Sequence, residues 1–222
     1  MPATHLYLFL FAVVWAMALL FFATRSFKVL GVAVALAVAQ LLLANTGFYD
    51  DTSTAPPRAL LLLAPSLLLI VVAWAPKGGR RLMRAASMPA LVLVHVCRIP
   101  VELVLHEAWL HDLVPEAMTY TGSNLDIVSG LSAILVWLYL RNVAHPSKAV
   151  LVIWNLLCLG LLFNIVITAV LSLPGPMQVL NHDLPNRLVL TSPYVLLPAV
   201  VVPIVLFAHL CALLKLRGDG RT

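Results

Sequence analysis

The chain has 222 residues, of which 62% are hydrophobic and only 10% are charged, and its formal net charge is +5. A soluble domain is about half apolar and about a quarter charged, so this composition excludes an ordinary soluble protein and indicates an integral membrane protein. The basic residues cluster between long apolar stretches, as they do in loops beside anionic lipid, and this placement argues against a nucleic-acid-binding protein.

Long apolar stretches follow one another along the whole chain. A helix needs about 20 apolar residues to cross the hydrocarbon core, and only helices and closed barrels satisfy their backbone hydrogen bonds in lipid. Stretches this continuous are not barrel strands. We therefore predict an all-α bundle of seven transmembrane helices that forms a single domain over residues 1–222. The predicted spans are 6–23, 29–44, 59–75, 89–110, 125–140, 149–173 and 194–216.

The connecting segments alternate between rich and poor in basic residues, which predicts the orientation of the chain. One set of segments holds Arg25, Lys28, Lys77, Arg80, Arg81, Arg84, Arg141, Lys148, Lys215, Arg217 and Arg221. The other set holds only Arg58 and Arg187. The positive-inside rule makes the first set cytoplasmic, so we expect the N-terminus outside and the C-terminus in the cytoplasm. The bias towards arginine, alanine, leucine and valine suggests a bacterial cytoplasmic membrane.

The fourth predicted span carries an unusual stripe of ionisable side chains. At about 100° per residue, one face of the helix presents His95, Arg98, Glu102, His106 and Trp109. Arg98 lies about 15 Å into the span, near the bilayer centre, where an arginine facing lipid costs at least about 2.5–3.5 kcal/mol. We expect Glu102, one turn away, to be its partner. Pro100 lies between them and leaves the carbonyl of Val96 without its helical donor.

Other predicted spans place polar side chains at matching depths. Counted from the cytoplasmic edge at about 1.5 Å per residue, an inner layer consists of His95, Asn155 and His209. An outer layer consists of Glu102, Asp126 and Asn164. Ser123 and Asp126 also have the spacing of a helix cap and capping box at the start of the fifth span. These layers predict a polar cavity between the fourth and seventh spans.

Three histidines near the outer face are candidate ligands for a divalent metal: His106, His111 and His182. However, the first two are five residues apart, so on a regular helix they point about 140° away from each other, and the segment is not an HExxH motif. The retinal proteins are excluded because the seventh span carries only Lys215, at its end. A rhomboid-like dyad is disfavoured because Ser129 and His209 differ in depth by about 15 Å.

Three functional hypotheses follow from these patterns. The leading one is a membrane protein that binds or transports a small solute or ion, with Arg98 as an anion contact or ion-pair switch and Glu102 as its partner or a proton carrier. In this hypothesis the lining of the site consists of His95, His106, Asp126, Asn155, Asn164 and His209. In the second, the protein is a membrane-embedded enzyme that uses Glu102 and the histidines for acid–base or metal chemistry. In the third, a non-catalytic assembly subunit in the lipid bilayer uses the Arg98–Glu102 pair as a structural clamp.

Overall fold

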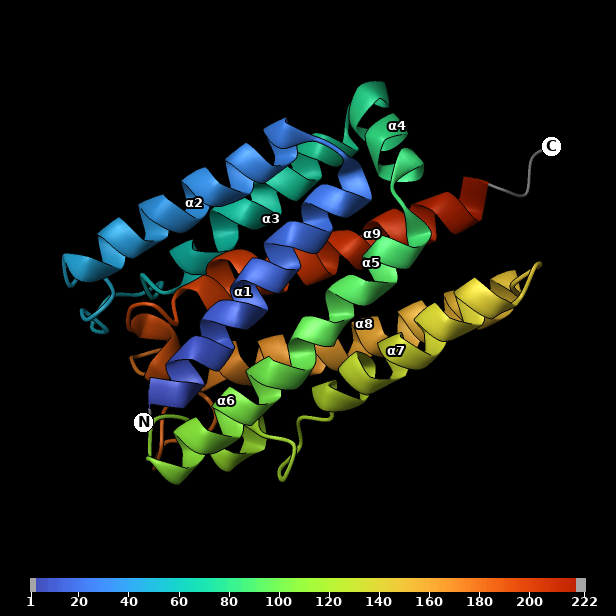
Figure 1. Ribbon diagram of the computed structural model, residues 1–222. Coiled ribbons are helices and arrows are strands. Elements are labelled where there is room, and N and C mark those ends of the chain that lie inside the picture. The colour runs from blue at the N-terminus through green and yellow to red at the C-terminus, as the bar shows by residue number, and fades with distance from the viewer. Residues whose placement is uncertain (1–2, 219–222) are drawn as a thin grey trace.

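The computed structural model describes residues 3–218, and the regular elements of that part of the chain are all helical (Figure 1). The helices are α1 (Ala3–Thr24), α2 (Phe27–Asn45), α3 (Leu60–Trp74), α4 (Lys77–Ala85), α5 (Met88–Val94), α6 (Arg98–Leu110), α7 (Asp126–Asn142), α8 (Lys148–Leu171) and α9 (Val202–Gly218). Short turns of 3₁₀ or π geometry are η1 (His95–Cys97), η2 (Glu116–Met118), η3 (Leu188–Leu190) and η4 (Leu197–Val201). The prediction of an all-α fold is confirmed for these residues.

Several of these helices are long and apolar enough to cross a membrane. By length and composition, five stretches qualify: α1, α2, the run Met88–Leu110, α8 and the run Leu197–Gly218. A sixth is reached if α3 and α4 are counted together, although the chain bends by 98° between them. Helix α7, with 17 residues, is slightly shorter than these. The helices therefore indicate a membrane protein, whereas the predicted total of seven spans and the predicted orientation stay predictions.

Two runs of helix form the centre of the bundle. In the apolar windows of Met88–Leu110 and Leu197–Gly218, 72% and 67% of the residues are buried, against 11% in α2. Helix α1 packs along α5 and α6, and α8 and α5 pack against α9. Figure 1 shows α2 and α3 on one side of this centre and α7 and α8 on the other. The outer helices carry most of the exposed leucine, isoleucine and valine side chains, as expected of surfaces that face lipid.

Prolines lie inside several helices of the bundle, and polar side chains of neighbouring helices satisfy the carbonyls that two of these prolines leave free. Pro65 in α3 cannot donate to the carbonyl of Leu61, and the Gln40 side chain on α2 donates to that oxygen instead, at 3.0 Å. Pro203 in α9 cannot donate to the carbonyl of Ala199, which accepts from the Ser66 hydroxyl at 2.7 Å. These bonds from neighbouring helices satisfy the carbonyls that the prolines leave free, as a low-dielectric environment requires.

The fourth predicted span is interrupted just before Arg98. Pro100 carries no N–H, and the helix there tightens into the 3₁₀ turn η1 between α5 and α6. Helix α7 approaches this turn closely at Gly130, where an added Cβ would lie 2.7 Å from Ile99 Cγ1 and 3.3 Å from the His95 carbonyl oxygen. The glycine thereby allows the start of α7 to lie against Arg98.

Candidate functional site

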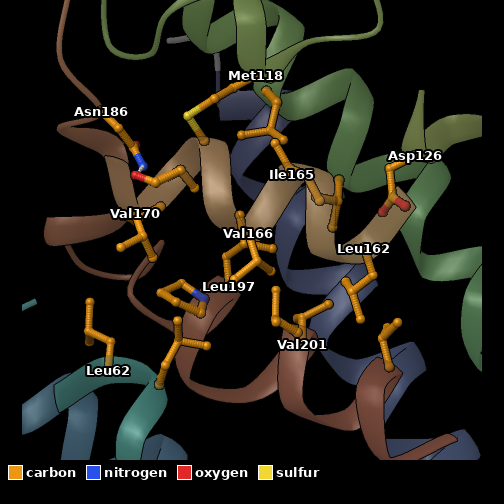
Figure 2. Close-up of a pocket in the computed structure, with 18 of the residues that line it drawn as sticks. Leu62, Met118, Asp126, Leu162, Ile165, Val166, Val170, Asn186, Leu197 and Val201 are labelled. Atoms are coloured by element: carbon orange, nitrogen blue, oxygen red, sulfur yellow. Dashed lines mark hydrogen bonds between the residues drawn. The ribbon is translucent and has the colours of Figure 1, made fainter. Parts of the chain in front are cut away.

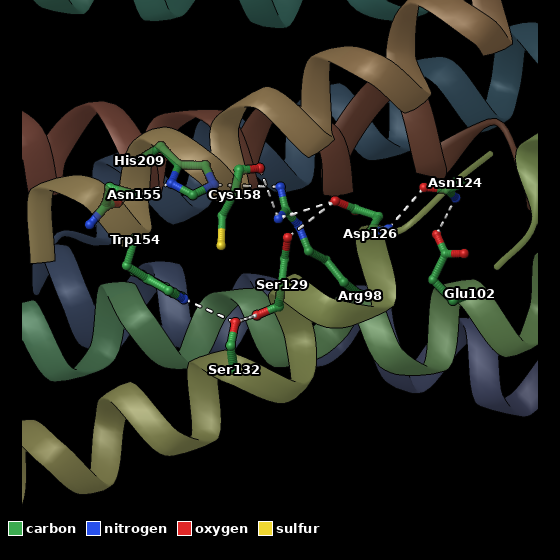
Figure 3. Close-up of polar contacts among 10 residues, drawn as sticks. All are labelled: Arg98, Glu102, Asn124, Asp126, Ser129, Ser132, Trp154, Asn155, Cys158 and His209. Carbon is green, nitrogen blue, oxygen red and sulfur yellow. Dashed lines mark hydrogen bonds and ion pairs between the residues drawn. The ribbon is translucent and has the colours of Figure 1, made fainter. Parts of the chain in front are cut away.

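Arg98 forms a buried ion pair with Asp126 (Figure 3). Its Nη1 lies 3.2 Å from Asp126 Oδ1, and the same nitrogen donates to the Cys158 carbonyl oxygen at 3.3 Å. Nη2 lies 3.5 Å from His209 Nε2. The side chains of Arg98 and Asp126 are only 3% and 8% exposed, so water does little to screen the pair. Three different helices therefore converge on the guanidinium group.

The predicted ion pair between Arg98 and Glu102 is wrong. Side chains on a helix lean towards its N-terminus, and Figure 3 shows the Arg98 guanidinium reaching away from Glu102 towards Cys158. The ion pairs of the described residues join Arg98 to Asp126 and not to Glu102. A carboxylate from the neighbouring helix meets the arginine better than one on the next turn of its own helix.

Glu102 is bound instead by an asparagine that the sequence analysis did not single out. Asn124 Nδ2 donates to Glu102 Oε1 at 2.6 Å and lies 3.0 Å from the Met118 carbonyl oxygen. The Asn124 Oδ1 atom accepts from the backbone N–H of Asp126 at 3.1 Å, so Asn124 also fixes the start of α7. The other carboxyl oxygen, Glu102 Oε2, is buried without a hydrogen-bond partner.

Asn124 also takes the role that was predicted for Ser123. The Ser123 hydroxyl donates to the Ala117 carbonyl oxygen at 3.0 Å rather than capping α7. The residue type of Asn124 could have predicted this contact, because an asparagine two residues before a helix commonly accepts a hydrogen bond from a backbone N–H at the start of that helix. The polarity of this loop residue alone did not reveal its second contact, with Glu102.

The predicted inner polar layer is present as a stacked cluster behind Arg98. The rings of His95 and His209 stack with centroids 4.1 Å apart, and Asn155 Oδ1 lies 3.0 Å from His209 Nδ1. Because Asn155 Nδ2 donates to the Leu151 carbonyl oxygen, its Oδ1 is the acceptor and His209 carries its hydrogen on Nδ1. The lone pair on Nε2 then faces the Arg98 guanidinium. All three of these layer residues are at most 1% exposed.

A pocket lies beside the ion pair, between α3, α6, α8 and the run formed by η4 and α9 (Figure 2). It contains about 800 Å³ of empty space including its open side, and about 80 Å³ admits the centre of a water-sized sphere, which is room for several waters. We call it the Arg98 pocket. Its wall is apolar except for four side chains: Arg98, Glu102, Asp126 and Asn186.

Asn186 contributes a polar group from the loop after α8. Figure 2 shows its side chain and that of Asp126 at opposite sides of the Arg98 pocket. Asn186 is fully buried; its Nδ2 donates to the Ala169 carbonyl oxygen at 3.3 Å, and its Oδ1 has no partner. The pocket therefore has an unpartnered acceptor atom both on α6 and on this loop.

A second depression, which we call the apolar groove, lies on the other flank of η4 and α9, against α1, α2 and α3. About 320 Å³ of it admits the centre of a water-sized sphere. Its wall is almost entirely aliphatic, with Lys28 and Ser66 as the polar exceptions. Two cavities thus border the same helical run.

A family model described as a domain of unknown function, DUF8737, matches residues 55–217. The chain belongs to this family. The DUF8737 region spans α3 to α9 and includes every residue of the ion pair, the histidine cluster and the Arg98 pocket. No curated protein and no solved structure matches the chain.

Five residues of the DUF8737 region that were predicted to line the cavity do not line the Arg98 pocket. His95, Asn155 and His209 form the cluster behind Arg98, and the other two, Asn164 and His106, lie elsewhere. Asn164 is exposed and donates to the Ser123 carbonyl oxygen at 3.0 Å, because it lies beside the buried face of α8 rather than on it. His106 is half-buried and stacks near Tyr120 and Trp109, with ring centroids 4.6 and 5.3 Å away. The polar side chains of the pocket wall therefore come from α6, α7 and the loop after α8 rather than from the whole predicted layer.

The residues predicted to bind a metal do not form a site in the described part of the chain. His111 Nδ1 lies 2.9 Å from the Glu107 carbonyl oxygen at the end of α6, whereas His106 turns to Tyr120 and His182 is exposed in a later loop. Within residues 3–218, no group of three or more histidine, cysteine, aspartate or glutamate side chains has a metal-binding arrangement. The five-residue spacing of the first two histidines accounts for their divergence.

Proposed function

We propose that this protein binds, and in doing so transports or senses, a small and largely apolar solute in the Arg98 pocket. The observation that carries the proposal is an apolar cavity within a membrane-type helix bundle whose few polar side chains include two buried acceptors without partners, Glu102 Oε2 and Asn186 Oδ1. Binding pockets for small molecules have this composition, with apolar walls and a few polar groups that orient the ligand.

The unpartnered atoms favour a binding site over a purely structural clamp. A clamp is expected to satisfy its own donors and acceptors, because an unsatisfied buried group costs about 1–3 kcal/mol. Both terminal nitrogens of Arg98 have partners, but Arg98 Nε and Glu102 Oε2 are buried without one. A ligand that supplies a donor to Glu102 relieves this cost, so the polar stripe combines a structural pair with a site open to a partner.

An enzymatic role has less support in the geometry. His95 and His209 lie in the cluster behind Arg98 and do not line the pocket, so the acid–base groups of the second hypothesis do not surround one reacting position. The two carboxyl groups of the pocket wall are Glu102 and Asp126, and the second is paired with Arg98. Of the described residues that line the pocket, none is a serine, threonine, cysteine, lysine or histidine that could act as a nucleophile or second proton carrier. We therefore place no reaction in this pocket.

A pocket-filling substitution tests the binding function. Val166 lies on α8 in the pocket wall, and Val150 lies on the same helix but is 48% exposed. We expect Val166→Phe to displace a bound molecule and Val150→Phe to leave it in place, with both variants folded by thermal melting. Mass spectrometry of the small molecules released on denaturing each purified protein gives the readout. Identical profiles for wild type and Val166→Phe contradict the proposal.

We also propose that the chain crosses the membrane seven times, with α3 and α7 as the two shorter spans. The support for α4 as a surface segment is the 98° bend after α3 and the basic side chains of α4, of which Arg80, Arg81 and Arg84 lie around the buried Met83. Basic amphipathic helices favour the interface beside anionic lipid. This arrangement agrees with the predicted orientation, in which the N-terminus lies outside and α4 lies at the cytoplasmic face of a bacterial membrane.

Cysteine labelling of intact cells tests the topology. Ser53 and Ser147 are exposed and lie in loops of opposite predicted sides, and the native Cys97, Cys158 and Cys211 are buried. With single cysteines introduced at these two serines, an impermeant thiol reagent is expected to label position 53 only. Labelling of position 147 alone reverses the orientation, and labelling of both positions overturns the number of spans between them.

A further inference from the structure

The wall of the Arg98 pocket contains more acidic than basic side chains. The three ionisable side chains in its wall are Arg98, Glu102 and Asp126, and the remaining lining residues carry no ionisable group. With each in its usual ionised form, their formal charges sum to one negative charge, because Asp126 neutralises Arg98 at 3.2 Å. The carboxylate left over is Glu102.

We propose that the solute bound in this pocket is an organic cation, a small apolar molecule that carries a protonated amine donating to Glu102. This inference rests on the proposed binding function and names its ligand class. It departs from the expectation that Arg98 is an anion contact, and the reason is the set of partners that the arginine already has.

Arg98 has little capacity left for an anion. Both terminal nitrogens are engaged, Nη1 by Asp126 and the Cys158 carbonyl and Nη2 by His209, and only Nε lacks a partner. An arginine recognises a carboxylate or phosphate best through two parallel N–H groups. An incoming anion would have to displace Asp126 and would leave that buried carboxylate without a counter-charge.

The free polar atoms of the pocket wall include two that require a donor. Glu102 Oε2 and Asn186 Oδ1 are both buried and unpartnered, and both are acceptors when the carboxyl group is ionised. An ammonium group has three donors and no acceptor, so it suits a carboxylate and an amide oxygen. A neutral alcohol supplies one donor but brings no positive charge to balance the ionised form of the Glu102 carboxyl at this depth.

The apolar residues of the pocket wall indicate the chemical nature of the rest of the ligand. Around the polar side chains the pocket is lined by branched aliphatic residues, including Leu62, Leu162, Ile165 and Val201. These surfaces favour an alkyl or aromatic body and disfavour a hydrated metal ion or a sugar, which would leave polar groups unpaired against them. The chemical class is therefore an amphiphilic amine rather than an inorganic cation.

A matched series of probes tests the charge preference with the whole protein in nanodiscs. The probes are hexylamine, hexanol and hexanoate, which share an alkyl chain and differ in charge. We expect hexylamine to raise the melting midpoint of the wild type at concentrations at least about tenfold lower than the other two, as a charge-assisted hydrogen bond implies. The Glu102→Gln variant keeps the shape of the side chain and is expected to lose this preference.

Glu107→Gln is the control for the series, because Glu107 lies on the same helix outside the pocket wall and contacts His5 and His111. It is expected to bind the probes as the wild type does. Equal binding of all three probes, with loss of all three in Val166→Phe, retains the pocket but overturns the cation preference. Preferred binding of hexanoate, or unchanged binding of hexylamine by Glu102→Gln, also overturns it. Binding of no probe by the wild type overturns both proposals.

Discussion

The ion pair between Arg98 and Asp126 makes a quantitative prediction for stability. Both side chains are almost fully buried and 3.2 Å apart, so removal of one leaves the other as an uncompensated charge in the bundle. Such a loss costs about 3–5 kcal/mol, which corresponds to a fall in melting midpoint of about 6–20 °C for a chain of this size. We expect this loss for Arg98→Leu and for Asp126→Leu separately.

The double variant tests whether the two charges are energetically coupled. Replacing Arg98 and Asp126 together by leucine leaves no stranded charge, so the double variant is expected to recover much of the stability lost by each single variant. Thermal melting in detergent, or unfolding in mixed micelles, measures the loss of stability for the two single variants and the double variant. The control is Asp51→Asn, which removes a surface pair with Arg58 and is expected to melt like the wild type. Additive losses in the double variant refute the pairing, and so does a larger recovery when Arg98→Leu is combined with Glu102→Leu.

Three further predictions concern the scaffold around the site. Ser66→Ala leaves the carbonyl freed by a proline of α9 without a donor, so melting is expected to show a loss of about 1–3 kcal/mol. Gly130→Ala is expected to cost about 1–3 kcal/mol because its Cβ would clash with η1 and α6, whereas Gly160→Ala, whose Cβ would meet nothing within 4 Å, serves as the control in the same melts. Hydrogen bonds from Ser53 hold the pKa of Asp51 below its usual value, so the contacts of this carboxylate stabilise the loop above its unfolded pKa and are lost as the pH falls through the folded pKa. In an NMR titration, Ser53→Ala is expected to raise the pKa of Asp51 towards its usual value.

The sequence predicts how deep a residue lies in a membrane bundle better than it predicts which way the side chain points around the helix axis. Depth follows from a constant rise of about 1.5 Å per residue, and on that basis His95, Asn155 and His209 were placed in one layer, where the structure has them in contact. Whether a side chain points into the bundle or away from it depends on how its helix is rotated against the neighbouring helices. Asn164 was assigned to the outer layer, but its side chain lies outside the buried face of α8.

The pairing of Arg98 shows the same division. The cost of a buried arginine correctly predicts that a carboxylate must be near, and Asp126 was expected at a depth close to that of Glu102. The choice between these two carboxylates depends on the 3₁₀ turn before Arg98, the close approach of α7 at Gly130 and the contact of Asn124 with Glu102. These are long-range features, and no local spacing in the sequence encodes them.

The two cavities on either flank of η4 and α9 have a mechanical consequence. Side chains at Leu197 and Val201 line the Arg98 pocket, whereas Val200 and Ile204 line the apolar groove, so this run is braced less tightly than a helix in a fully packed core. The π turn η4 weakens its backbone ladder at the same level. We therefore expect this run to be displaced sideways more easily than α6, which borders only one of the two cavities, and its amide protons to exchange with solvent deuterium faster than those of α6.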